Sequence, residues 1–98
     1  MIKLISPEEL KGKLKSQESI QLIDIRERYE YDEGAICKEN IPLEQMMTSV
    51  DKIVKDRPVI IYCQSGKRSS SIIYMLEKEF KFNNLYSLDG GYKAYSEI

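Results

Sequence analysis

The feature that most constrains the fold is an unbroken apolar run, Val59-Ile60-Ile61-Tyr62, which follows a proline. A strand without polar alternation is typical of a parallel sheet that is covered on both faces. A helical pattern over residues 69–80 comes soon after it, with Ile72, Ile73, Leu76 and Phe80 at helical spacing. A buried strand followed closely by an amphipathic helix is typical of an α/β domain.

The rest of the chain continues this alternation of strands and helices. Further strands are expected at residues 20–25 and 85–88, helices at 6–15, 44–55 and 92–97, a helical turn at 27–33, a polar loop at 37–40 and an extended segment at 41–43. A length of 98 residues suits one domain. We therefore predict a single domain over residues 1–98, a three-layer α/β fold with a mainly parallel five-stranded sheet flanked by helices.

Composition excludes several classes of function. A net charge of −1 gives no broad footprint for nucleic acid. No apolar run approaches the ~20 residues of a membrane span, and the N-terminus has no secretory signal. Two cysteines are too few for a disulfide scaffold, which favours a reducing cytoplasm. Because the chain lacks histidine, catalysis by a cysteine–histidine pair and metal binding by histidine are excluded, and we expect no metal.

The strongest chemical signal is the loop between the apolar run and the helix, Cys63-Gln64-Ser65-Gly66-Lys67-Arg68. A cysteine at this position faces the N–H groups of the loop and of the helix N-terminus, which favour the thiolate form. Gly66 permits a tight curl, and Lys67 and Arg68 add positive charge. The loop therefore predicts a sulfur nucleophile, Cys63, in a cradle of residues 64–68 shaped for an anion.

Two other interpretations of this loop are possible. A buried structural cysteine before an ordinary helix is the general alternative, but the glycine and two basic residues disfavour it. A phosphate-binding P-loop needs Gly-x4-Gly-Lys-Ser/Thr, and Ile61 and Arg68 occupy two of its required positions. The P-loop interpretation is therefore rejected.

Four segments in order resemble the single-domain rhodanese sulfurtransferases. They are Asp24-Ile25-Arg26-Glu27 with Glu30-Tyr31 and Gly34, then Asn40-Ile41-Pro42, then Cys63-x4-Arg68-Ser69 after its apolar strand, and finally Leu88-Asp89-Gly90-Gly91. Together they span nearly the whole chain. The resemblance implies a rhodanese-like fold.

The resemblance also implies an activity. The Cys63 thiolate would take a sulfane sulfur from a small donor such as thiosulfate, and the resulting persulfide would pass it to cyanide, a thiol or a sulfur-carrier protein. Gln64, Ser65, Gly66, Lys67, Arg68 and Ser69 would form the substrate loop. Asp24 and Arg26 would support it, or would be a capping aspartate and a surface arginine. No cofactor is implied, and Cys37 is expected to be incidental.

Two alternatives to sulfur transfer remain at this point. A non-catalytic rhodanese-fold module could dock a partner or sense oxidation. A small cysteine phosphatase or arsenate reductase ranks lower, because the related phosphatases have the wider loop Cys-x5-Arg. The short stretch from Gly34 to Pro42 resembles rhodanese domains that are fused to activating enzymes of sulfur-carrier systems.

Overall fold

In the computed structural model, which describes residues 2–98, five strands form one parallel sheet in the order β1-β5-β4-β2-β3. The strands are β1 (Leu4–Ile5), β2 (Gln21–Asp24), β3 (Glu39–Asn40), β4 (Val59–Tyr62) and β5 (Leu85–Leu88). The apolar strand β4 lies in the centre, where Ile60 is in register with Leu22 of β2 and with Tyr86 of β5. The predicted α/β fold with a five-stranded sheet is confirmed.

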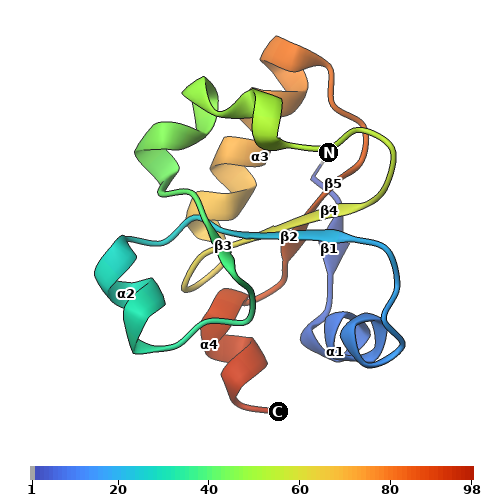
Figure 1. Cartoon of the computed structure of the whole chain (residues 1–98), viewed down its shortest axis with the longest axis vertical. Helices are drawn as coiled ribbons and strands as arrows, with labels where there is room; N and C mark the ends of the chain where they lie inside the picture. Colours follow the sequence, from blue (N-terminus) through green and yellow to red (C-terminus); the bar gives the residue numbers. More distant parts are fainter. Residues whose placement is uncertain (1) are drawn as a thin grey trace.

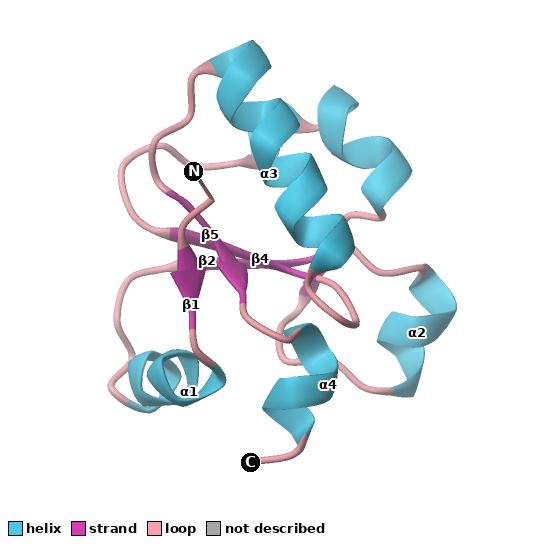
Figure 2. Ribbon diagram, turned by 180° about the vertical axis from the view of Figure 1, so that it is seen from behind, coloured by secondary structure: helices cyan, strands magenta, loops and turns pink. Residues whose placement is uncertain are grey.

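Helices cover both faces of the sheet and give the fold three layers (Figure 1; Figure 2). The helix α3 (Lys67–Phe80) lies on one face, beside the 3₁₀ helices η1 (Leu43–Thr48) and η2 (Val50–Lys52). The helices α1 (Pro7–Lys15) and α4 (Gly91–Ser96) lie together on the other face, and α2 (Arg28–Glu33) follows β2.

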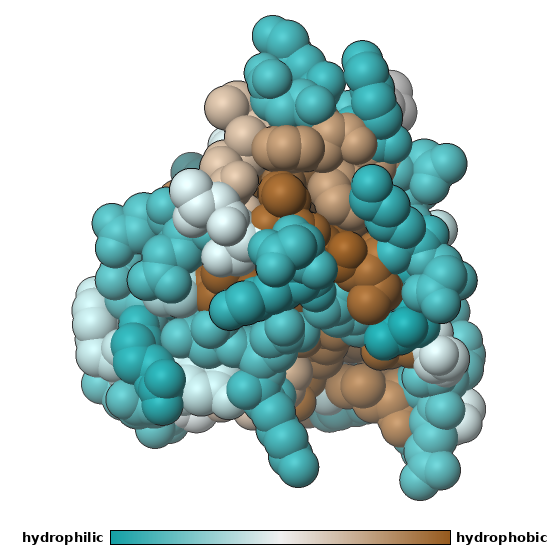
Figure 3. Space-filling model, turned by 45° about the horizontal axis from the view of Figure 1, so that its top comes forward, coloured by the Kyte–Doolittle hydropathy of each residue, from teal (hydrophilic) through white to brown (hydrophobic). Residues whose placement is uncertain are grey.

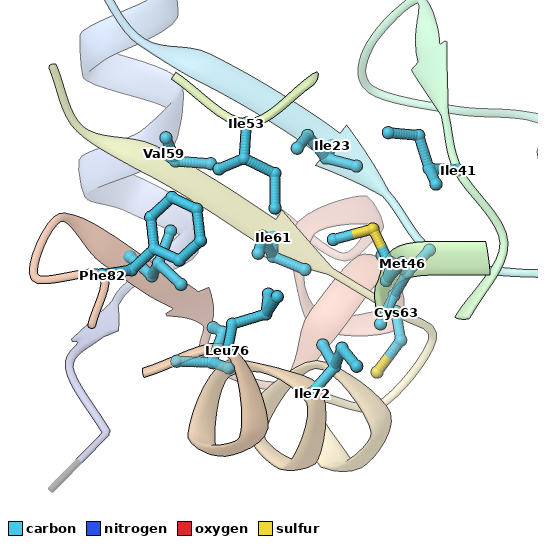
Figure 4. Packing of buried hydrophobic residues seen from close by; sticks show 13 residues of the cluster. Ile23, Ile41, Met46, Ile53, Val59, Ile61, Cys63, Ile72, Leu76 and Phe82 are labelled. Carbon is cyan, nitrogen blue, oxygen red and sulfur yellow. The ribbon is translucent and has the colours of Figure 1, made fainter. Parts of the chain in front are cut away.

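Strand β4 contributes to the packing on both faces. Val59 and Ile61 belong to the cluster beneath α3, and Figure 4 shows them in a row that continues to Cys63. Ile60 and Tyr62 belong to the cluster beneath α1 and α4. Because successive side chains point to opposite faces, a strand covered on both sides must be apolar at every position. This explains the unbroken apolar run in the sequence.

Two predicted segments differ from the structure. Residues 44–55 do not form an α-helix, because the chain there makes the two short 3₁₀ helices, which are separated at Ser49 with φ of −119°. Thr48, Ser49 and Val50 form helices poorly, which favours short 3₁₀ turns over a continuous α-helix. Residues 37–40 are not entirely loop, because Glu39–Asn40 pairs with β2 as the edge strand β3.

Several helix ends agree with their sequence signals. Ser6 Oγ accepts a hydrogen bond from the N–H of Glu9 at 3.1 Å, so it caps α1 as expected. The helix expected at 69–80 begins two residues earlier, at Lys67, behind Gly66.

None of the helices within residues 2–98 is long and apolar enough to cross a membrane.

One end of the molecule exposes apolar surface. Val50, Phe80 and Phe82 line a shallow hollow between η2 and the end of α3. The space-filling view from the upper end shows apolar side chains open between polar ones (Figure 3). This surface is distant in the fold from the loop that carries Cys63, which lies at the opposite end of α3.

Candidate active site

Cys63 lies at the carboxyl end of the central strand, where ligands bind in open α/β sheets. It is on the α3 face of the sheet, and its side chain points toward the first turns of that helix (Figure 4). Residues 64–66 then curl back so that α3 begins behind the sulfur. Gly66 makes this curl with φ of 97°, a left-handed conformation that favours glycine.

The curl directs main-chain N–H groups at the sulfur. The N–H of Gly66 lies 3.1 Å from Cys63 Sγ, and the N–H of Ser69 lies 3.4 Å from it. The Ser69 hydroxyl oxygen is 3.7 Å from the sulfur. Of the predicted cradle over residues 64–68, Gly66 contacts the sulfur through its N–H, and Ser69 joins it from the first turn of α3.

The cradle favours the ionised form of the cysteine. Burial of the thiol raises the pKa of Cys63, and hydrogen bonds from Ser69, Gly66 and Ser65 lower it by more. The pKa of Cys63 therefore lies below its ordinary value. The cause is the set of donors around the sulfur, which stabilise its negative charge.

The sulfur of Cys63 is enclosed. A sulfur that meets its substrate directly should be exposed, but Cys63 is 0% exposed. The loop residues Ser65 and Lys67 are exposed around it. The amides point inward as predicted, while the enclosure means that a donor can reach the sulfur only after side chains around the loop move.

The two basic residues of the loop do not contact the sulfur. Lys67 is exposed at the start of α3. Arg68 extends to α2, where its Nη1 lies 3.4 Å from Glu30 Oε1. Burial raises the pKa of Glu30, but hydrogen bonds from the Glu27 N–H and from Arg68 lower it further, so this carboxyl has a lowered pKa. Arg68 thus ties the loop to α2.

Asp24 and Arg26 form a buried ion pair beside the loop. Asp24 is 0% exposed and Arg26 is 2% exposed, and Arg26 Nη2 donates to Asp24 Oδ2 at 2.8 Å. The same guanidinium donates to the carbonyl of Gly34 at 2.6 Å and to Gln64 Oε1 at 3.3 Å. It also lies 4.2 Å from the centre of the Tyr92 ring. Arg26 is therefore an internal brace of the loop, and the surface alternative is excluded.

A hollow opens next to this brace. Its volume is about 360 Å³, and it is lined by Arg26, Glu30, Glu33, Gly34, Gln64 and Tyr92. It brings Gln64 of the loop and the ion-paired Glu30 to one concave surface. This hollow is therefore a concave approach to the loop from the α2 side.

The start of α4 donates hydrogen bonds to the loop, a role that the sequence did not indicate. The N–H of Tyr92 donates to the carbonyl of Cys63 at 2.8 Å, and the N–H of Lys93 donates to that of Gln64 at 3.0 Å. Gly91 has φ of +64°, and a Cβ on it would lie 2.5 Å from the Cys63 carbonyl oxygen. The adjacent glycines Gly90 and Gly91 are the sequence signal that was available for this close approach.

Cys37 occupies a different environment. Its sulfur lies 3.3 Å from the Glu39 carbonyl oxygen and 3.6 Å from the Tyr62 hydroxyl. It packs against the cluster on the α1 and α4 face, whereas Cys63 belongs to the α3 face, and both are free thiols. Burial raises the pKa of Cys37, and its hydrogen bonds with Tyr62 and Glu39 only partly oppose this. Cys37 therefore has the opposite pKa shift from Cys63.

Comparison with known proteins identifies the class to which this fold and loop belong. The family model described as the rhodanese-like domain matches residues 6–98, so the chain belongs to the rhodanese-like family. A solved rhodanese-like domain protein from Staphylococcus aureus shares 27% identity, with a TM-score of 0.86 over 96% of this chain and 91% of that one.

Two curated relatives are more similar in sequence. The protein YqhL of Bacillus subtilis is 40% identical over 76 residues, which cover 76% of this chain and 60% of that protein. The thiosulfate sulfurtransferase GlpE of Shewanella oneidensis is 32% identical over 81 residues, which cover 81% of this chain and 78% of that protein. The chain thus has sulfurtransferases of the rhodanese type among its homologues, and it spans about three fifths of the length of YqhL.

Proposed function

We propose that this protein is a rhodanese-type sulfurtransferase in which Cys63 carries the transferred sulfur. The observation that carries the proposal is the pair of main-chain N–H groups, from Gly66 and Ser69, that point at the Cys63 sulfur. They lower the pKa of Cys63 and would also stabilise the negative charge of a persulfide. The proposed small donor is thiosulfate, because the relative GlpE is named as a thiosulfate sulfurtransferase.

The proposed reaction has two steps. In the first step the Cys63 thiolate attacks the outer sulfur of thiosulfate, so that a new S–S bond forms while the old one breaks. Sulfite leaves with the electron pair of that bond, and Cys63 becomes a persulfide anion. In the second step cyanide or a thiol attacks the outer sulfur, and the Cys63 thiolate leaves.

Neither step requires a general base, which suits a chain without histidine. The thiolate is already ionised when it attacks, and each leaving group departs as an anion. The residues around Cys63 therefore have to supply hydrogen-bond donors and not a proton acceptor. Gln64, Ser65 and Lys67 would complete the loop that surrounds the incoming sulfur, and Asp24 and Arg26 would hold the loop in place.

The mass of the intact protein after incubation with thiosulfate tests the proposal. The wild-type chain should gain the mass of one sulfur atom, and subsequent cyanide should remove it and release thiocyanate. Cys63→Ser should gain nothing. Cys37→Ser is the matched control, because it removes the other free thiol, and it should load sulfur as the wild type does.

The enclosed sulfur favours a second candidate, a rhodanese-fold module that docks a partner or senses oxidation. Cys63 is 0% exposed, and a module without turnover has no need of an accessible nucleophile. A wild-type mass that stays unchanged with thiosulfate and other sulfane donors would support this candidate and refute the enzyme. Turnover of p-nitrophenyl phosphate that depends on Cys63 would instead indicate a phosphatase.

A further inference from the structure

A line of serine hydroxyls leads away from the sulfur of Cys63 toward the surface. Ser69 Oγ lies 2.7 Å from Ser87 Oγ, and Ser70 Oγ donates to Ser87 Oγ at 3.4 Å. Ser69 and Ser87 are both 0% exposed, whereas Ser70 is half-buried and lines a hollow at the surface. Ser87 belongs to β5 and reaches the site from a strand that is distant in sequence from the loop.

The Ser69 hydroxyl has one proton and several candidate partners. Ser69 Oγ donates to the carbonyl of Gly66 at 3.1 Å, accepts from the Cys63 thiol at 3.7 Å and lies 2.7 Å from Ser87 Oγ. A hydroxyl donates a single hydrogen bond but accepts two. An ionised Cys63 has no proton to donate, so its thiolate competes with the Gly66 carbonyl for the Ser69 proton, provided that Ser69 accepts from Ser87 and does not donate to it.

The outer serine favours one direction. Because Ser70 donates to Ser87, the Ser87 oxygen already has a donor, and its own proton is free for Ser69. Ser69 then accepts from Ser87 and can direct its proton to the Cys63 thiolate. Hydrogen bonds arranged in such a chain polarise and strengthen one another.

We propose that Ser87 is a positioning residue for Cys63, and that it acts through Ser69 by directing the Ser69 hydroxyl proton to the thiolate. The inference rests on the proposed role of Cys63 as an ionised nucleophile. The hydrogen bond from Ser87 makes the Ser69 hydroxyl a stronger donor, which can turn its proton from the Gly66 carbonyl to the charged sulfur. Without the Ser87 hydroxyl, the Ser69 proton would stay on the Gly66 carbonyl. The thiolate would then lose its side-chain donor and keep only its main-chain N–H donors.

Charged groups on the surrounding elements are already paired or exposed. Asp24 and Arg26 pair with each other at the end of β2, and Arg68 of α3 pairs with Glu30 of α2. Lys67 at the start of α3 and Asp89 after β5 lie toward the surface. Within residues 2–98, the hydrogen bonds at the Cys63 sulfur are made with Gly66 and Ser69 and not with these charged groups. The serine line is thus a separate influence on the thiolate.

The pKa of Cys63 is the readout that distinguishes positioning from a merely structural role. It is measured from the thiolate absorbance near 240 nm during a pH titration, in a Cys37→Ser background, with Cys63→Ser as the blank. A donor to a charged group contributes about 1.5–3 kcal/mol and one pKa unit corresponds to about 1.36 kcal/mol, so we expect Ser87→Ala to raise the pKa by about one unit. Ser70→Ala should raise it by less, and Ser87→Thr, which keeps a hydroxyl, should restore it.

Two further variants complete the test. Ser71→Ala is the matched control, because Ser71 is the next serine of α3 but is exposed, and it should leave the pKa unchanged. Ser69→Ala should raise the pKa, and adding Ser87→Ala to it should have no further effect, because Ser87 acts through Ser69. Independent, additive shifts would contradict the proposed route.

An unchanged pKa in a folded Ser87→Ala variant overturns the inference, even if that variant melts at a lower temperature. If Ser87→Ala does not fold, Ser70→Ala decides, since an unchanged pKa there also overturns it. The measurement needs no turnover. A pKa shift in a protein that never loads sulfur would uphold the serine line and refute the enzyme, whereas loading without any shift would do the reverse.

Discussion

Replacement of Gly91 by alanine should disturb both stability and the loop of Cys63. The backbone of Gly91 has φ of +64°, and a left-handed conformation costs an ordinary residue about 1–2 kcal/mol. The added Cβ would also lie 2.5 Å from the Cys63 carbonyl oxygen and 2.6 Å from the Gln64 carbonyl carbon. These are main-chain atoms that cannot rotate away, and overpacking of this kind costs about 1–3 kcal/mol.

The sum predicts that Gly91→Ala lowers the free energy of unfolding by about 2–5 kcal/mol. Domains of this size have about 5–15 kcal/mol in total, so the loss would be large. Displacement of the loop would also lengthen the hydrogen bonds from Tyr92 and Lys93 to its carbonyl groups, now 2.8 and 3.0 Å. We therefore expect slower loading of sulfur on Cys63 in whatever fraction remains folded.

Urea unfolding followed by circular dichroism measures the effect, and Gly12→Ala is the matched control. Gly12 lies within α1, and a Cβ there would meet nothing within 4 Å among residues 2–98. Since alanine favours a helix over glycine by about 0.8–1 kcal/mol, Gly12→Ala should be stabilising. If Gly91→Ala fell within about 0.5 kcal/mol of the wild type, the close contact between α4 and the loop would be refuted.

Three more predictions concern charges. Asp24→Asn should lower the free energy of unfolding by about 3–5 kcal/mol in a denaturant titration, because it leaves the buried charge of Arg26 unpaired. Asp32→Asn, which breaks an exposed ion pair, should lower it by less than about 0.5 kcal/mol. Equal effects of the two substitutions would contradict the buried brace. Because the folded state lowers the pKa of Cys63, its thiolate stabilises the fold above the ordinary thiol pKa, and this contribution is lost as pH falls through the lowered value. The unfolding free energy of the wild type should therefore rise with pH relative to Cys63→Ser in this window, and a constant difference between the two proteins would argue against a lowered pKa. Arg68→Ala should raise the pKa of Glu30 in an NMR titration, and an unmoved pKa would argue against the ion pair.

The parts of the fold that the sequence predicted well have strong local patterns. The central strand β4 and the helix α3 each carry an uninterrupted pattern over at least four residues. The edge strands β1 and β3 are only two residues long, which is too short for any periodicity to appear. The apolar spacing of residues 43–54 suits an α-helix as well as two 3₁₀ turns, and Ser49 decides the outcome through its backbone.

The sequence likewise predicted one part of the candidate site and missed another. The loop of Cys63 is contiguous in sequence, so its curl around the sulfur could be predicted. Ser87, Gly91 and Glu30 reach the loop from three other elements, and only the packing of the sheet brings them there. The enclosure of the sulfur likewise depends on neighbours distant in sequence. Sequence patterns predict which residues do chemistry more readily than which residues hold them in place.

The shortness of the two outermost strands has a consequence for how this protein behaves at high concentration. An exposed strand edge is a template onto which another chain can add, and long flat edges lead to fibres. Here β1 and β3 present two residues each, and Pro42 follows shortly after β3 and has no N–H to donate. The open margins of the sheet thus give an incoming strand little to pair with, and the all-parallel core stays protected from edge-to-edge aggregation.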